Sequence, residues 1–160
     1  MFGLTTLGLF HTVISLIAVA AALIAFFKYK EISWNNGLGK IYVIATVVTC
    51  LTGFGIFQHG GFGKPHALGI ITLLALAIAA LAEQTALLGR LARYVAVIGY
   101  SATVLFHMIP AITEASTRLP LGHPLLANAE DPALKTATAV LLALFLIGAA
   151  LQVRRLRASR

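Results

Sequence analysis

Long apolar stretches alternate with short polar links along the whole chain. Five of these stretches are long enough to be membrane-spanning helices, since about 20 residues of helix cross a hydrocarbon core about 30 Å thick. The pattern predicts an all-α integral membrane bundle of five transmembrane helices, in a single domain over residues 1–160. The expected spans are 4–27, 40–57, 66–82, 94–112 and 133–151. The first stretch lacks a basic start and is too long for a signal peptide, so we expect it to be a helix.

The composition supports the same class. Of the 160 residues, 59% are hydrophobic and 11% are charged, against roughly 45–50% and roughly 25% in soluble domains. A soluble domain is therefore excluded, and the single cysteine, Cys50, excludes a disulfide scaffold within the chain. The net charge of +7 does not indicate a nucleic-acid partner, because the basic residues lie between the apolar stretches. The expected partner is the lipid bilayer.

The positions of the basic residues predict the orientation. Lys and Arg beside a span resist translocation, so the more basic side faces the cytoplasm. With five spans, the more basic side carries Lys28, Lys30, Lys40, Arg90, Arg93, Arg154, Arg155, Arg157 and Arg160, and the other side carries Lys64, Arg118 and Lys135. We therefore expect the amino terminus outside and the carboxy terminus in the cytoplasm, in a bacterial cytoplasmic (inner) membrane.

All five histidines fall in the predicted outer half. His11 lies in the first span and His107 in the fourth, and at 1.5 Å per residue both come roughly 10 Å below the outer boundary. His59 and His66 flank a glycine-rich link, and His123 lies in the outer loop, which is expected from about residue 113 to 132. Because ionisable groups inside a membrane usually face the bundle interior, we expect His11 and His107 to face each other.

Polar side chains continue the faces of both intramembrane histidines. Ser15 lies one turn below His11, and Thr103 and Tyr100 lie one and two turns below His107. A face of small or polar residues, which lets helices approach closely, is also predicted on the second span. It comprises Tyr42, Thr46, Thr49 and Gly53.

Three interpretations of the histidines stay open, and the first is a haem b site. Two imidazoles on separate helices can ligate the iron from opposite sides, so His11 and His107 are the candidate axial ligands. Lys64, Arg118 or one of the histidines near the boundary would meet the propionates. This interpretation predicts a small electron-transfer or redox subunit, with a quinone, another membrane redox partner or a larger complex as its partner.

The second interpretation is a small metal site, in which His11, His107, His59 and His66, with Glu114, ligate a Zn or Cu ion. The third is that the histidines only pack and form hydrogen bonds between helices. The chain is then a non-catalytic integral subunit that packs against a larger membrane complex. No catalytic residue is predicted under any of the three.

Two carboxylates have simpler expected roles. Glu83, near the inner end of the third span, is a candidate proton-relay group, but the favoured interpretation places it at the interface or in a pair with Arg90 or Arg93. Glu114 is expected to form an ion pair with Arg118, four residues later.

Two segments resemble a group of small bacterial membrane proteins without an established activity. The first is Phe10-His11 followed by Gly37-Leu38-Gly39-Lys40-Ile41-Tyr42 at the entry to the second span. The second is Phe106-His107-Met108-Ile109-Pro110 with Thr117-Arg118-Leu119-Pro120. The resemblance implies a five-span inner-membrane protein. Members of the group often carry a histidine just before the Gly-basic motif, where this chain has Asn35-Asn36. A looser similarity, to small haem b membrane proteins, rests on architecture alone.

Overall fold

A computed structural model gives the fold and describes residues 5–57, 61–85 and 87–159. Over these residues the chain forms five α-helices and one short 3-10 turn. They are α1 (Thr6–Tyr29), α2 (Gly37–Gly53), α3 (Lys64–Gln84), η1 (Gly89–Leu91), α4 (Ala92–Arg118) and α5 (Pro132–Ala158). The predicted all-α class is confirmed.

Four of the described helical segments are long and apolar enough to cross a membrane: α1, α3, η1 with α4, and α5. The exception is α2, whose 17 residues extend about 25 Å at 1.5 Å per residue. This helix ends at Gly53 rather than near residue 57, because Gly53 and Gly55 are both poor helix formers. The chain is therefore a membrane protein by the length and composition of its helices.

The fourth helix is longer than predicted. It continues to Arg118 instead of ending near residue 112, and Glu114 and Arg118 form the expected ion pair within its last turns. It ends where Leu119 adopts extended backbone (φ −119°, ψ 145°), as is favoured for a residue that precedes a proline. The link to α5 therefore covers residues 119–131 and is shorter than expected.

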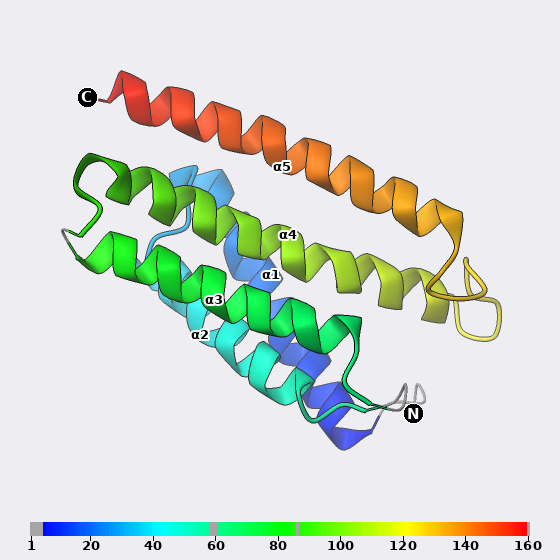
Figure 1. The fold of residues 1–160 in the computed structure, drawn as a ribbon. Helices are drawn as coiled ribbons and strands as arrows, with labels where there is room; N and C mark the ends of the chain where they lie inside the picture. The colour runs from blue at the N-terminus through cyan, green and yellow to red at the C-terminus, as the bar shows by residue number, and fades with distance from the viewer. Residues whose placement is uncertain (1–4, 58–60, 86, 160) are drawn as a thin grey trace.

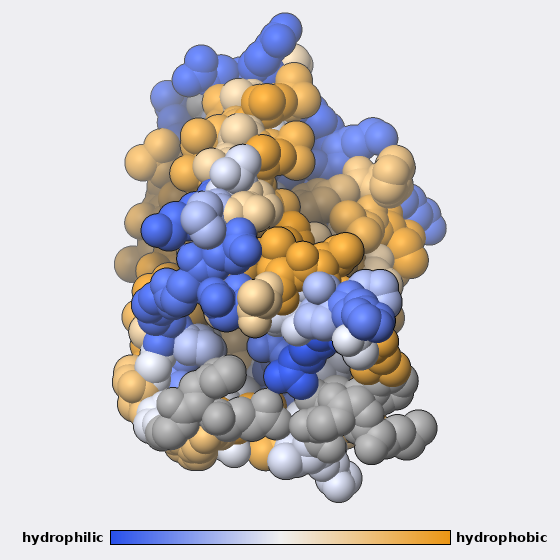
Figure 2. All heavy atoms as spheres, turned by 90° about the vertical axis from the view of Figure 1, so that its right-hand side faces the viewer, coloured by the Kyte–Doolittle hydropathy of each residue, from blue (hydrophilic) through white to orange (hydrophobic). Residues whose placement is uncertain are grey.

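Successive helices run in opposite directions, so five helix termini gather at each end of the structure (Figure 1). We call the end with residues 6, 53, 64, 118 and 132 the histidine end, and the end with residues 29, 37, 84, 92 and 158 the basic end. Seen from the histidine end, hydrophilic and hydrophobic surface is mixed (Figure 2). The fifth helix lies beside α4, on the outside of the bundle formed by α1–α4 (Figure 1).

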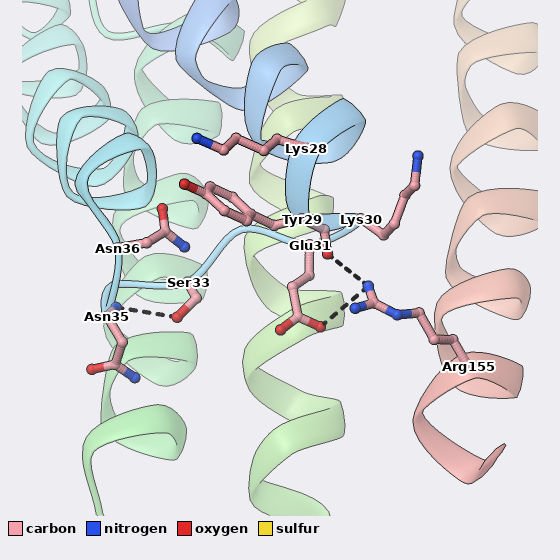
Figure 3. A pocket seen from close by; sticks show the side chains of 8 residues that line it. All are labelled: Lys28, Tyr29, Lys30, Glu31, Ser33, Asn35, Asn36 and Arg155. Carbon is pink, nitrogen blue, oxygen red and sulfur yellow. Dashed lines mark hydrogen bonds and ion pairs between the residues drawn. The ribbon is translucent and has the colours of Figure 1, made fainter. Parts of the chain in front are cut away.

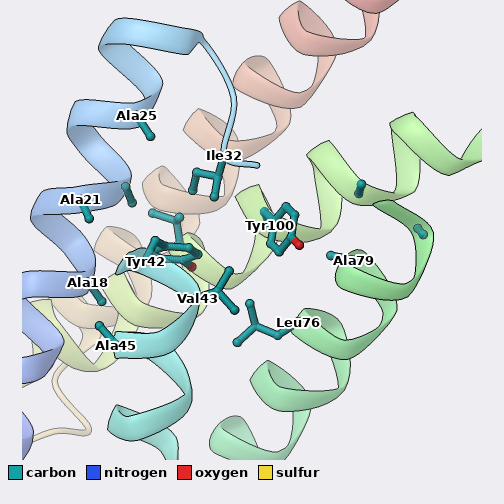
Figure 4. Packing of buried hydrophobic residues seen from close by; sticks show 14 residues of the cluster. Ala18, Ala21, Ala25, Ile32, Tyr42, Val43, Ala45, Leu76, Ala79 and Tyr100 are labelled. Atoms are coloured by element: carbon teal, nitrogen blue, oxygen red, sulfur yellow. The ribbon is translucent and has the colours of Figure 1, made fainter. Parts of the chain in front are cut away.

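Small residues allow the helices of this bundle to approach closely. Four buried alanines line one face of α1: Ala18, Ala21, Ala22 and Ala25. They belong to a core cluster that also includes Tyr42 of α2, Leu76 of α3 and Tyr100 of α4 (Figure 4). A lipid-filled membrane offers little hydrophobic driving force between helices, so such close packing supplies much of the association energy.

Candidate functional site

His107 connects three helices through its imidazole ring. Its Nε2 lies 3.1 Å from the Thr46 hydroxyl of α2, and its Nδ1 lies 3.5 Å from the Ser15 hydroxyl of α1. The ring also packs beside Tyr42, with 6.2 Å between ring centroids. Only 6% of His107 is exposed. Both ring nitrogens of this buried side chain are therefore engaged by hydroxyl groups of neighbouring helices.

His11 lies one turn closer to the histidine end than Ser15, about 6 Å away along α1. Its Nδ1 lies 3.1 Å from the Thr52 hydroxyl. That hydroxyl also donates to the backbone oxygens of Val48 and Thr49, so it accepts the hydrogen of His11 Nδ1. In the neutral ring this tautomer leaves the Nε2 lone pair unprotonated. A Cβ atom at Gly53 would lie 3.2 Å from His11 Cε1, so glycine makes room for the ring.

The middle of the bundle contains a hydrogen bond between Tyr42 and Thr103. Their hydroxyl oxygens are 2.6 Å apart, and both residues are fully buried. The Thr103 hydroxyl donates to the backbone oxygen of Tyr100, 2.7 Å away. It follows that Tyr42 donates to Thr103.

Glu83 lies near the basic end of α3, where four groups donate to its carboxylate. The Tyr100 hydroxyl and the Trp34 backbone N–H each lie 2.9 Å from Oε2. The Asn35 amide lies 3.1 Å from Oε1, and Ser33 donates to the same oxygen. The sequence favoured the interface or a pair with Arg90 or Arg93 for Glu83, and of these two arginines Arg93 lies 3.7 Å from Glu31 instead. Glu83 joins α3 and α4 to the link between α1 and α2.

These contacts form what we call the polar series, a set of side chains that runs through the interior of α1–α4 from the histidine end to the basic end. Its members are His11, Thr52, Ser15, His107, Thr46, Tyr42, Thr103, Tyr100 and Glu83. The two tyrosines project into the core between the helices (Figure 4).

The other predicted ligands lie elsewhere. His66 stacks on Phe57 and packs against the tilted ring of Phe62, with ring centroids 5.0 and 5.2 Å away. Its Nδ1 accepts from the Gly63 N–H at 3.3 Å. Its Nε2 is buried without a hydrogen-bond partner in the described part of the chain. His59 lies outside the described residues.

The basic residues proposed to meet propionates already have acidic partners. Lys64 pairs with Glu130 at 3.1 Å, and Arg118 pairs with Glu114. His123 is exposed in the link between α4 and α5.

Within the described ranges, no three His, Cys, Asp or Glu residues gather closely enough to hold a metal ion. A bis-histidine haem has a further requirement, since one ring nitrogen of each axial histidine must face the iron. In the tautomer assigned above, His11 keeps a lone pair on Nε2 for this purpose. In His107, Thr46 and Ser15 contact both ring nitrogens, so neither nitrogen is open to an iron in this arrangement. The packing around His107 favours hydrogen bonding over ligation, and cofactor binding by these residues stays a prediction.

Comparison of the chain with protein-family models, curated proteins and solved structures gives no match. The resemblance of its two segments to a group of small bacterial membrane proteins therefore stays a prediction. Arguments about function rest on the polar series itself.

Proposed function

We propose that this chain is a five-span inner-membrane protein that carries protons along the polar series, as a subunit of a redox or transport assembly. The observation that carries the proposal is the row of buried and half-buried hydroxyl, imidazole and carboxylate groups over the depth of α1–α4. Placing ionisable groups such as His107 and Glu83 inside a membrane is costly, and a proton relay is one of the functions that such groups serve there.

The connections between helices support five spans, although α2 is short. If α1 and α3 cross the membrane, the chain must return from the basic end to the histidine end between them. The links around α2 cover only residues 30–36 and 54–63, so α2 has to make that crossing. An odd number of spans places the termini on opposite sides, and the basic residues favour a cytoplasmic carboxy terminus.

Each group of the polar series is able to pass a proton. An imidazole takes up a proton at one nitrogen and releases another from the second, and a hydroxyl both accepts and donates. His107 has Ser15 on one nitrogen and Thr46 on the other, which is the arrangement such an exchange requires. At the basic end, the Glu83 carboxylate is the acceptor for the Tyr100 hydroxyl.

Three steps of the route follow a single helix for one turn. They lead from His11 to Ser15 on α1, from Thr46 to Tyr42 on α2, and from Thr103 to Tyr100 on α4. Residues three or four apart on a helix are neighbours on its surface, and a bridging water molecule can connect polar groups that do not touch directly. The route we propose therefore includes bridging water at each of these three positions.

A structural role is the second candidate, and one observation favours it. Both nitrogens of His107 are already satisfied by hydroxyl groups, as expected of a histidine that only joins helices. In that case the protein is a non-catalytic subunit, and replacing His107 affects stability without affecting any proton movement.

Proton flux into liposomes distinguishes the two candidates. The purified protein is reconstituted with a pH-sensitive dye inside, and a potassium gradient with valinomycin drives protons across the membrane. His107→Gln and Glu83→Gln should each lower the flux by about 10²-fold, the contribution typical of a positioned proton-transfer group. Glu114→Gln, which changes a carboxylate outside the polar series, is the matched control and should conduct like the wild type. A wild-type flux equal to that of empty liposomes would refute proton transport.

An absorption spectrum of the same preparation tests the haem b prediction. A Soret band that disappears in both His11→Ala and His107→Ala would support axial ligation by these two residues. It would also require Thr46 and Ser15 to give up their bonds to His107 when haem is bound. A colourless protein with normal proton flux would support the polar series without a cofactor, and elemental analysis would detect a bound Zn or Cu ion.

A further inference from the structure

Two hollows meet near the basic end, and they differ in chemistry. The first has a volume of about 440 Å³ and is lined by polar and charged residues, among them Lys28, Lys30, Glu31 and Arg155 (Figure 3). The second has a volume of about 490 Å³ and is a largely apolar groove between α4, α5 and the end of α1. Both volumes lie in the range of about 300–1,000 Å³ that is typical of small-molecule sites.

The two hollows share Lys30 and Arg155. In Figure 3 both side chains extend into the space between the end of α1 and α5. A ligand that occupied both hollows would therefore have a polar part beside these two cations and an apolar part along the groove.

Two small residues of α5 form part of the groove wall. Gly148 and Ala149 line it together with larger side chains such as Val104, Met108 and Phe145. A Cβ atom built on Gly148 would meet nothing within 4 Å, so the space beside this glycine is open. An apolar chain can lie there without displacing a protein side chain.

The charges at the junction favour an anion. Of the described residues that line the polar hollow, Lys28, Lys30 and Arg155 are basic and Glu31 is the one carboxylate. The Arg155 guanidinium donates to the backbone oxygen of Tyr29 at 2.7 Å and lies 3.9 Å from Glu31, and these contacts hold it at the junction. Lys30 uses one of its donors on the Phe27 backbone oxygen. Because a guanidinium has five N–H donors and an ammonium has three, both side chains retain donors for a ligand.

We propose that the two hollows together bind one anionic phospholipid, with its phosphate between Lys30 and Arg155 and one acyl chain in the groove along Gly148. Anionic lipids are attracted to clusters of basic residues at a membrane surface. A neutral lipid or a quinone would use the groove but would gain nothing from the excess positive charge. The proposal is independent of proton movement, because neither Lys30 nor Arg155 belongs to the polar series.

Lipid retained through purification tests the proposal. The protein is purified in detergent, and its bound phospholipid is extracted and quantified by mass spectrometry. Defined lipids are then added back from vesicles of phosphatidylcholine with or without phosphatidylglycerol. We expect the wild type to retain an anionic lipid and to rebind phosphatidylglycerol in preference to phosphatidylcholine.

Two variants probe the two parts of the site. Gly148→Leu fills the groove and should abolish retention, and Ala150→Leu, on the exposed face of the same helix, is its control. Arg155→Gln should lower retention about fivefold, the factor typical of one basic residue near anionic lipid. Arg157→Gln, which removes the same charge from an exposed position, should change little, and Arg155→Lys should preserve binding.

Three results would overturn the proposal. They are equal binding of the two phospholipids, unchanged retention in Gly148→Leu, and equal losses in Arg155→Gln and Arg157→Gln. Inorganic phosphate at millimolar concentration should not displace the lipid, and displacement would show that the site recognises a free anion rather than a phospholipid. If Gly148→Leu does not fold, the comparison of Arg155→Gln with Arg157→Gln decides the question.

Discussion

Replacing Gly39 by alanine should destabilise the protein more than any other single methyl addition we consider. A Cβ atom at this position would lie 1.8 Å from the Ser33 backbone oxygen and 2.6 Å from its carbonyl carbon. Real Cβ atoms essentially never approach a heavy atom more closely than 3.0 Å. The conflicting atoms belong to the backbone, so a side-chain rotation cannot relieve the contact. Either the start of α2 or the link that contains Ser33 must move.

The expected cost follows from what that movement disturbs. Overpacking of a closely packed site costs about 1–3 kcal/mol, and a backbone conflict belongs at the upper end of that range. Displacement of Ser33 also weakens its bond to Glu83, and a hydrogen bond to a charged group contributes about 1.5–3 kcal/mol. We therefore expect Gly39→Ala to lose about 3 kcal/mol or more, which is over a hundredfold in the unfolding equilibrium.

Gly37→Ala is the matched control. It lies two residues earlier in the same helix, and a Cβ atom there would meet nothing within 4 Å. Because alanine is the better helix former by up to about 1 kcal/mol, this variant should be as stable as the wild type or more so. Unfolding by sodium dodecyl sulfate in mixed micelles, followed by circular dichroism, measures both variants. Equal stability of the two would refute the close approach of Ser33 to α2.

Three further predictions concern single contacts and the orientation. Thr46→Val should lose about 0.6 to 1.7 kcal/mol in the same unfolding assay, the range measured for hydrogen bonds between membrane helices, whereas Thr46→Ser should keep most of the stability. Glu114→Gln should lose no more than about 0.5 kcal/mol, since an i,i+4 ion pair near a helix end is weak; a loss above 1 kcal/mol would contradict this. A cysteine at Gly61 should react with an impermeant thiol reagent on intact cells and one at Ser159 should not, and the reverse pattern would invert the proposed topology.

The helices themselves were predictable because a membrane helix needs a long apolar stretch, and such stretches are visible in the sequence. The positions of the helix ends were harder to predict. The last turns of α4 are polar, and they are held by bonds within the helix, such as the Glu114–Arg118 pair, that hydropathy does not report. Similarly, α2 begins at Gly37, before the predicted residue 40, because Asn36 caps it by accepting from the Gly39 N–H at 2.9 Å.

The polar faces were predictable from helix geometry. A helix repeats every 3.6 residues, so residues such as Ser15, Thr46 and Thr103 could be assigned to the faces of their helices. Which face contacts which neighbouring helix depends on how the helices pack, and the sequence alone does not specify that packing. The partners of Glu83 illustrate the limit, because three of its four donors come from residues 33–35 of a short link. Its depth near the inner end of the helix instead predicted the interface or a pair with Arg90 or Arg93.

The same packing explains why two intramembrane histidines have different chemical possibilities. His11 meets a threonine whose hydroxyl is already donating to backbone oxygens, so one ring nitrogen stays unprotonated in the neutral tautomer. His107 lies deeper, between the hydroxyls of Ser15 and Thr46, which occupy both nitrogens. If the two rings act together, protons enter at His11 and pass inward through His107. A bound haem would instead require His107 to give up a hydroxyl partner and bind the iron. Loss of the Thr46 hydroxyl therefore distinguishes proton transfer from haem binding. The Thr46→Val variant should lose proton flux, whereas its affinity for haem should be unchanged or higher.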